Sequence, residues 1–282
     1  MNQQDQQPSD QKKQSSNQSI GKKGILVVSF GTSYENTRKA CIESVENKIA
    51  KIFPEYEIRR AFTSQIIIKK LAERDNIKID NPKEALQKMK EEGFSEVIVQ
   101  PLHIINGSEF EEIVEVVKEF EGSFDKLSLG RPILTHVKDY KIAVEAIKEQ
   151  LPKLDKGQAV VFMGHGSEHP ANSAYACLQS VINHSDLNGK VFIATVEGYP
   201  TLDYVIEDLK TKNINEVILM PFMLVAGDHA INDMAGDEED SWKTILQKEG
   251  YVVSTYLHGL GENPAFQQIY IDHVKDTIQG EN

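Results

Sequence analysis

The sequence predicts an α/β protein made of two similar Rossmann-like lobes, with parallel sheets flanked by helices and a cleft between the lobes. Two observations predict this class. From residue 22 onward, short apolar runs of strand type alternate with stretches of helical periodicity, and the runs are apolar throughout instead of at every second residue. Segments of the first half also recur in the second half, which indicates a pseudo-twofold repeat.

The first half supplies three strands and three helices in alternation. The strands are short, rich in β-branched or apolar residues, and bounded by turn residues: GILVVSF (24–30), EIRRAF (57–62) and EVIVQPL (96–102). The helices show apolar residues at helical spacing: ENTRKACIESVENKIAKIF (35–53), SQIIIKKLAERD (64–75) and PKEALQKMKEEG (82–93). This order is typical of a parallel sheet with helices on both faces.

The repeat predicts where the second lobe begins. EVIVQPLHIINGSE (96–109) aligns without a gap with EVILMPFMLVAGDH (216–229), and LVVSFGTS (26–33) is matched with VVFMGHGS (160–167). Each half therefore begins with a strand that ends in a glycine-containing loop. We expect an N-terminal lobe over 22–140 and a C-terminal lobe over 141–282.

Composition restricts the partners. The 282 residues carry a formal net charge of -12, so a nucleic-acid backbone or an anionic membrane would be repelled, and a cation or small ligand fits better. The two cysteines form no disulfide framework and no CxxC pair. No segment is long and apolar enough to span a membrane, which favours a cytoplasmic protein.

The first residues form a polar segment. Residues 1–21 are mostly Gln, Ser, Asn, Asp and Lys, and they contain too little apolar surface to offset the entropy of ordering. We predict a disordered tail there. A tail of this composition also resembles the spacer that follows an export signal or a lipid anchor, so an extracytoplasmic location is the alternative.

Three strand ends of the second half carry side chains that bind metals. His165 follows VVFMG between two glycines, Glu197 follows VFIATV, and His229 follows the strand that leads into AGD. Because ligands of open parallel sheets bind outside the carboxyl ends of the strands, these side chains are expected at one rim. Two imidazoles and a carboxylate that leave coordination positions open are typical of a catalytic metal site.

Each of these residues also has an ordinary structural explanation. A histidine at a strand end is commonly a hydrogen-bonded or capping residue, and Glu197 can support the N-terminus of the helix that starts near Pro200. His103 and His169 are weaker site candidates, and His103 can be a core histidine. No GxGxxG, P-loop or GxSxG motif is present, so no nucleotide cofactor is expected.

A resemblance to a known family rests on six long motifs. They are LVVSFGTSYENT, RAFTSQIIIKKL, LHIINGSEFEEIV, VVFMGHGSEHPANSAYACL, VEGYPTLDYVI and MPFMLVAGDHAINDMAGDEEDSWK. Together they resemble the sirohydrochlorin cobaltochelatases of the anaerobic pathway, class II chelatases similar in fold to protoporphyrin ferrochelatase. The resemblance runs from about residue 24 through the last helix.

The resemblance implies ATP-independent insertion of Co(II) into sirohydrochlorin, or a close precorrin relative, in cobalamin biosynthesis. His165 matches the catalytic histidine of the family, His229 its second histidine, and Glu197 its metal-binding carboxylate. Glu109 matches an acidic residue on the opposite lobe. On this basis the histidines hold the metal and one then accepts a pyrrole proton, while Glu109 relays the other.

The implied substrate is a tetrapyrrole with many carboxylates, which a chain of charge -12 must bind through local donors. Ser29, Thr32, Ser33 and Ser167 are candidate substrate-binding residues, or else they cap the helices that follow. Candidate cationic donors are Lys22, Lys23, Arg59 and Arg60.

Two other functions remain open at this stage. One is a non-catalytic carrier of the metal or tetrapyrrole, and the other is iron insertion toward sirohaem, since ligand type alone does not decide the metal. The apolar face of the last helix, AFQQIYIDHVKDTI (265–278), packs either within the chain or against another subunit, so a homo-oligomer is also open.

Overall fold

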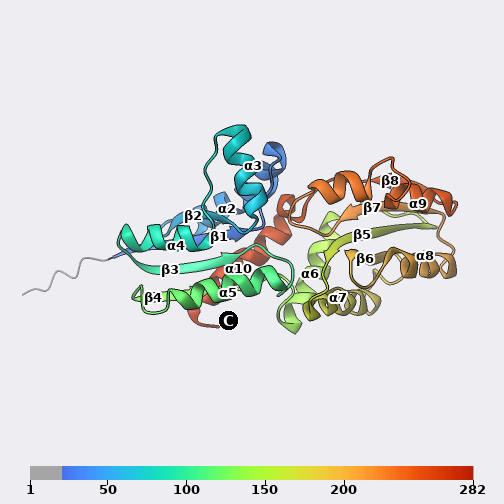
Figure 1. The fold of residues 1–282 in the computed structure, drawn as a ribbon. Helices are drawn as coiled ribbons and strands as arrows, with labels where there is room; N and C mark the ends of the chain where they lie inside the picture. The colour runs from blue at the N-terminus through green and yellow to red at the C-terminus, as the bar shows by residue number, and fades with distance from the viewer. Residues whose placement is uncertain (1–20, 282) are drawn as a thin grey trace, which may run out of the picture.

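A computed structural model describes residues 21–281 and contains two parallel sheets (Figure 1). The first has the strand order β2-β1-β3-β4 and the second the order β6-β5-β7-β8. The strands are β1 (Lys22–Ser29), β2 (Glu57–Phe62), β3 (Phe94–Pro101), β4 (Lys126–Leu129), β5 (Gln158–Gly166), β6 (Val191–Glu197), β7 (Glu216–Pro221) and β8 (Val252–Thr255). All neighbouring strands pair in parallel, which confirms the predicted α/β class.

The second sheet repeats the first in topology and in register. Lys23 pairs with Glu96 across β1 and β3 at 2.7 Å, and Gln158 donates to Glu216 at the same place in β5 and β7 at 2.9 Å. β3 ends at Pro101 and β7 ends at Pro221, and the residue after each of these central prolines donates its backbone N–H to the neighbouring strand. The bonds run from Leu102 to the Val28 carbonyl and from Phe222 to the Met163 carbonyl, each at 2.7 Å. The internal repeat therefore exists in three dimensions.

The strand register corrects one predicted pairing by one residue. Val28 lies opposite Pro101 in β3, and Met163 lies opposite Pro221 in β7. Matching LVVSFGTS with VVFMGHGS residue by residue aligned the small residues of the loops, but the ladder hydrogen bonds fix the strands one position away. The counterpart of His165 is consequently Phe30, since each directly precedes a glycine with positive φ.

The helices flank both sheets and follow the predicted alternation. In the first half they are α1 (Glu35–Thr37), the π-helical η1 (Arg38–Glu43), α2 (Ser44–Ile52), α3 (Gln65–Asp75), α4 (Pro82–Glu91), α5 (Ser108–Glu119) and α6 (Val137–Gln150). In the second half they are η2 (Pro170–Asn172), α7 (Ser173–Asn183), α8 (Leu202–Thr211), η3 (Ala230–Met234), α9 (Trp242–Lys248), η4 (Leu260–Glu262) and α10 (Pro264–Gln279).

The C-terminal helix α10 returns to the first lobe. It packs against β3 and α2, and in Figure 1 it lies among the N-terminal elements. Its apolar face is buried, with Phe266, Tyr270 and Ile271 fully enclosed, and the Tyr270 hydroxyl donates to the Leu102 carbonyl at 2.9 Å. The apolar face of the last helix is thus covered within the chain.

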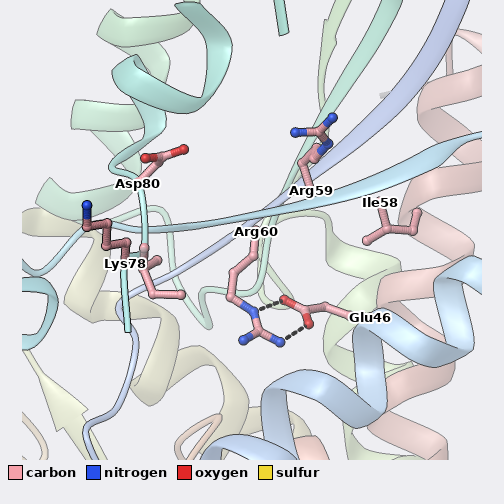
Figure 2. A pocket seen from close by; sticks show the side chains of 7 residues that line it. Glu46, Ile58, Arg59, Arg60, Lys78 and Asp80 are labelled. Carbon is pink, nitrogen blue, oxygen red and sulfur yellow. Dashed lines mark hydrogen bonds and ion pairs between the residues drawn. The ribbon is translucent and has the colours of Figure 1, made fainter. Parts of the chain in front are cut away.

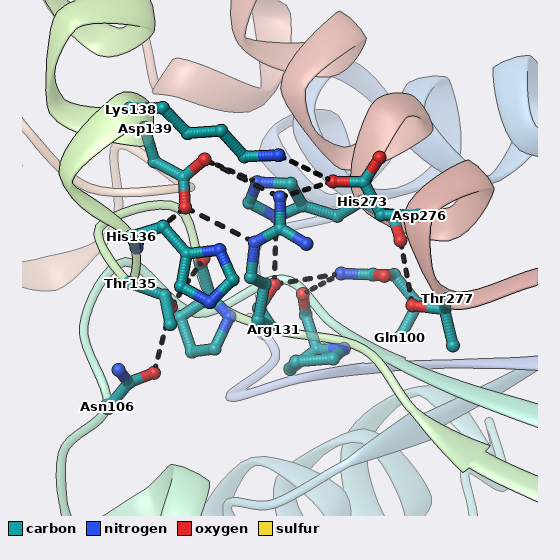
Figure 3. Close-up of polar contacts among 12 residues, drawn as sticks. Gln100, Asn106, Arg131, Thr135, His136, Lys138, Asp139, His273, Asp276 and Thr277 are labelled. Carbon is teal, nitrogen blue, oxygen red and sulfur yellow. Dashed lines mark hydrogen bonds and ion pairs between the residues drawn. The ribbon is translucent and has the colours of Figure 1, made fainter. Parts of the chain in front are cut away.

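A buried polar network ties α10 to α6 (Figure 3). Arg131 lies 2.6 Å from Asp276 and 3.2 Å from Asp139, and His273 lies 3.5 Å from Asp139. Burial alone would raise the pKa of Asp139, but hydrogen bonds from His273, the His136 backbone and Arg131 hold it well below the usual range. The Asp139 carboxylate therefore stays ionised.

Four predictions remain predictions: the boundary between the lobes, the disordered tail, the cytoplasmic location and the homo-oligomer. The boundary proposed between residues 140 and 141 falls inside α6, and the proposed disordered tail lies outside the described residues except for Gly21. Within residues 21–281, no helix has the length and apolar character needed to cross a membrane. The cytoplasmic location and the homo-oligomer are still expectations from the sequence.

Candidate functional site

A cleft of about 610 Å³ lies between the lobes, formed by α3, the start of α5 and the loops after β1, β3, β5, β6 and β7. Its volume falls in the range of about 300–1,000 Å³ that small-molecule sites have. Apolar side chains line it from both sides, among them Phe30, Ile104, Phe110, Met223 and Val225. All three predicted metal ligands and Glu109 also line it.

His165 stands near the end of β5, and the glycines beside it are required by packing. Gly166 has φ +80°, and a Cβ there would collide with the Glu197 carbonyl. A Cβ on Gly164 would press on the Tyr175 ring. These glycines let β5 approach β6 and α7 closely. This leaves the His165 side chain exposed at the rim.

His165 and His229 are in contact. Their ring centroids are 4.7 Å apart and the rings are nearly perpendicular, at 89°. The Nδ1 of His165 is 3.0 Å from the Gly166 carbonyl oxygen, and the Nδ1 of His229 contacts the Asp233 carboxylate. A carbonyl and a carboxylate only accept, so each Nδ1 carries the proton and each Nε2 has a free lone pair in the neutral ring.

This arrangement is the one that metal-binding histidines need. A ligating imidazole commonly donates its other N–H to a carbonyl or carboxylate, which fixes the tautomer and the ring orientation. Neither His165 Nε2 nor His229 Nε2 has a hydrogen-bonding partner among the described residues. The two Nε2 atoms are thus available to a metal or a proton.

Glu197 ends β6 and lines the same cleft with an exposed side chain. Thr201 holds the N-cap position of α8, and Glu197 makes no hydrogen bond to that helix among the described residues. In residues 21–281, however, no three His, Cys, Asp or Glu side chains are gathered closely enough to hold a metal. The structure brings the two histidines together and leaves Glu197 on the same rim.

The opposite wall carries Glu109 in the first turn of α5. Its Oε2 lies 3.3 Å from His103 Nε2, and the His103 side chain is only 9% exposed. Neither ring nitrogen of His103 has a well-formed hydrogen bond within the described part of the chain, so His103 is a cleft residue instead of a satisfied core histidine. Glu109 and Tyr175 line the same cleft; burial raises the pKa of Tyr175 to about 12, and the Glu109 charge adds to this rise.

Two polar contacts join the lobes around the cleft. The Tyr34 hydroxyl donates to Asp228 at 3.2 Å, and His169 Nε2 lies 3.2 Å from Glu111. Burial and the Asp228 carboxylate raise the pKa of Tyr34, so its phenol keeps the donated proton. The first contact connects two loops, and the second connects the N-cap residue of η2 with the first turn of α5.

Three of the four hydroxyl residues proposed to bind the substrate lie in the cleft. Thr32, Ser33 and Ser167 line the cleft, whereas Ser29 is 1% exposed and does not. Thr32 Oγ1 accepts from the Tyr34 N–H at 3.2 Å, and Ser167 Oγ accepts from the His169 N–H at 3.1 Å. Those two hydroxyls already stabilise the turns beside the cleft.

The cations proposed from sequence lie elsewhere. Arg59 and Arg60 line a separate hollow with Lys78 and Asp80, where Arg60 binds Glu46 (Figure 2). Arg59 donates to Glu57 at 2.7 Å. Both arginines are therefore neutralised by acidic side chains and are not free to bind a substrate carboxylate. Among the described residues Lys70 on α3 does line the cleft, and it was missed because it lies on a helix and not at a strand end.

Comparison with known proteins identifies the family. The family model described as cobalt chelatase (CbiK) matches residues 23–279. A sirohydrochlorin cobaltochelatase of Salmonella typhimurium is 45% identical over 91% of this chain and 97% of its own length. The sirohydrochlorin cobaltochelatase CbiKC of Nitratidesulfovibrio vulgaris is 35% identical over 91% of each chain.

A solved structure supports the same fold. SirB from Bacillus subtilis with Fe3+ has a TM-score of 0.62 at 18% identity, covering 92% of this chain and 98% of the other. At that identity the likeness concerns the fold alone, and it agrees with two parallel-sheet lobes around a cleft. The family model and the two relatives carry the assignment: the chain belongs to the cobalt chelatase (CbiK) family.

Proposed function

We propose that this protein is a sirohydrochlorin cobaltochelatase, which exchanges the two pyrrole N–H protons of sirohydrochlorin for Co(II). Family membership and two relatives of that name, matched over nearly their full lengths, support this activity. The structural observation that carries it is a pair of adjacent histidines that line the cleft and whose Nε2 atoms have no partner among the described residues.

In this proposal His165, His229 and Glu197 receive the cobalt substrate. Two imidazole nitrogens and a carboxylate oxygen suit a borderline divalent ion and leave positions open for the incoming pyrrole nitrogens. Glu197 has to turn toward the histidines when the ion binds, and its exposed side chain has the freedom to do so. Asp233 orients His229 for this role.

The two pyrrole protons leave to opposite walls of the cleft. One goes to a histidine of the His165–His229 pair after that ring releases the metal, because a metal-bound nitrogen has no lone pair to accept it. The other goes to Glu109, which is backed by His103 at 3.3 Å. A carboxylate on one face and an imidazole on the other suit a planar ring that gives up a proton to each side.

The macrocycle lies between the apolar walls in this proposal. Phe30, Ile104 and Val225 supply surface for its faces. Thr32, Ser33 and Ser167 are proposed to contact its polar periphery, along with backbone N–H groups of their loops. Ser29 has no place in this contact because it is buried behind the strand end.

A turnover assay tests the function. Purified protein, Co(II) and sirohydrochlorin are mixed without oxygen, and the visible spectrum should show metallation of many substrate molecules per protein. A single stoichiometric event would instead indicate a carrier. Competition between Fe(II) and Co(II) in the same assay decides between cobalamin and sirohaem synthesis, and faster iron insertion would contradict the proposed metal.

A further inference from the structure

The cleft has a strong imbalance of charge. Glu109, Glu197 and Asp228 line it with carboxylates, and Lys70 is the single lysine or arginine among the described residues that do so. A polycarboxylate substrate meets repulsion from these acidic groups and from a chain of net charge -12. Binding therefore needs a cation within the cleft itself.

Lys70 is available for that role, unlike its neighbours. Its ammonium makes no ion pair or hydrogen bond with the described part of the chain. Arg74, one turn further along α3, is paired with Asp75 at 2.6 Å and also donates to the Ser33 carbonyl. Lys69 lies 3.8 Å from Glu73 and does not line the cleft.

An exposed isoleucine lies one helical turn before Lys70. Ile66 is 78% exposed although it is a large apolar residue, and it lines the cleft. Residues four positions apart share one face of a helix, so Ile66 and Lys70 present a joint surface of apolar and cationic character. Such a surface matches a macrocycle with a flat apolar centre and carboxylates at its edge.

We propose that Ile66 and Lys70 form the face of α3 that recognises the tetrapyrrole, with the Lys70 ammonium bound to a peripheral carboxylate and Ile66 against the adjacent ring edge. This inference rests on the proposed function and extends it to the orientation of the substrate. Lys70 does not touch the reacting nitrogens in this arrangement. It sets the affinity for the macrocycle and not the rate of metal insertion.

The test compares Lys70→Met with Lys69→Met, a matched loss of charge on the same helix outside the cleft. Loss of one charge-assisted contact should raise the KM for sirohydrochlorin about 10-fold in Lys70→Met, while kcat and the KM for Co(II) stay within about 2-fold. Lys69→Met should leave all three unchanged. Lys70→Arg should restore most of the affinity, because it keeps the charge.

Salt and substrate charge provide a second readout. Raising the salt from about 0.05 M to about 0.5 M should weaken substrate binding more in the native protein than in Lys70→Met, since the screened contact is already absent there. A metal-free porphyrin with only two carboxylates should discriminate less between the two proteins. Equal salt dependence in both would contradict the inference.

The two proposals fail in different ways. If the native protein turns over but Lys70→Met behaves as Lys69→Met does, the recognition face is wrong and the chelatase activity stands. If the native protein does not turn over, the proposed function fails. Direct titration of sirohydrochlorin by absorbance still tests Lys70 in that case, with unchanged affinity in Lys70→Met as the contradicting result.

Discussion

Corresponding strand ends of the two sheets carry different chemistry. The strand registers match Phe30 with His165 and Ser64 with Glu197, and the sequence repeat matches Glu109 with His229. Ser64 accepts a hydrogen bond from the Ile67 N–H and caps α3, whereas Glu197 is separated from α8 and caps nothing. One lobe therefore presents apolar and proton-accepting groups, and the other presents metal ligands.

This difference shows how an internal repeat can form a site whose two walls have different chemistry. The strand order, the ladder register and the turn after each central proline are the same in both lobes. The side chains at the rim differ between the lobes, so the fold provides two facing edges and the sequence gives each a different role. A planar substrate between such edges meets the metal on one face and a proton acceptor on the other.

The largest expected effect comes from removing a metal ligand. His229→Ala and His165→Ala should each lower kcat at least about 100-fold, because each removes both a ligand and a proton acceptor. His184→Ala is the control, since His184 is an exposed histidine at the end of α7. Turnover of His229→Ala at the native rate would contradict the assignment of the C-terminal lobe.

The next largest effect is expected from removing the proton acceptor Glu109 on the opposite wall of the cleft. Glu109→Gln keeps the shape of the side chain and removes its basicity, so kcat should fall about 10- to 100-fold while Co(II) binding is unchanged. Stopped-flow absorbance separates metal binding from ring metallation. Loss of Co(II) affinity in Glu109→Gln would mean that the two lobes do not divide the chemistry as proposed.

A smaller effect should follow from removing the carboxylate that orients the His229 ring. Asp233→Asn replaces the carboxylate beside His229 Nδ1 and should raise the KM for Co(II) about 10-fold, as changes to groups that orient metal ligands do. The KM for sirohydrochlorin should not change. Asp237→Asn, in an exposed pair with Lys243 nearby in the sequence, is the control and should behave as the native protein.

The smallest effect on turnover is expected for a change at Asp139, which lies far from the rim. The effect of that change is on the stability of the fold. The pKa of Asp139 is below its ordinary value, so its carboxylate stabilises the fold above about pH 3.9 and loses that effect as the pH falls further. Asp139→Asn should lower the free energy of unfolding at pH 7 by about 3 kcal/mol. Thermal melts from pH 7 to pH 3 should show the difference from the native protein shrinking, and a constant difference would contradict it.

The sequence predicts much of the fold because strands and helices follow local patterns. The strand expected at 57–62 is β2, and the helix expected at 64–75 is α3 with Ser64 as its N-cap. The return of α10 to the first lobe was not predictable, because an amphipathic pattern shows that a face is buried and not what covers it. The one-residue shift between the halves depends on ladder hydrogen bonds between distant segments.

The site was predictable where it follows strand ends. His165 and His229 were expected at one rim, and their rings are in contact. The residues that support these histidines and line the rest of the cleft could not be predicted, because their positions depend on how the chain packs. They are His103 beside Glu109, Asp233 beside His229, and Lys70 on the cleft face of α3. The arginines were misplaced because acidic partners from other elements also bind them: Glu92 at the end of α4 binds Arg59, and Glu46 on α2 binds Arg60.

A crystal soaked with Co(II) tests the division of roles most directly. Anomalous scattering should place one cobalt ion within bonding distance of His165 Nε2 and His229 Nε2, with Glu197 turned toward it and the Glu109 side free for the macrocycle. Cobalt bound at Glu109 and His103 instead, with the two histidines of the C-terminal lobe empty, would contradict the account.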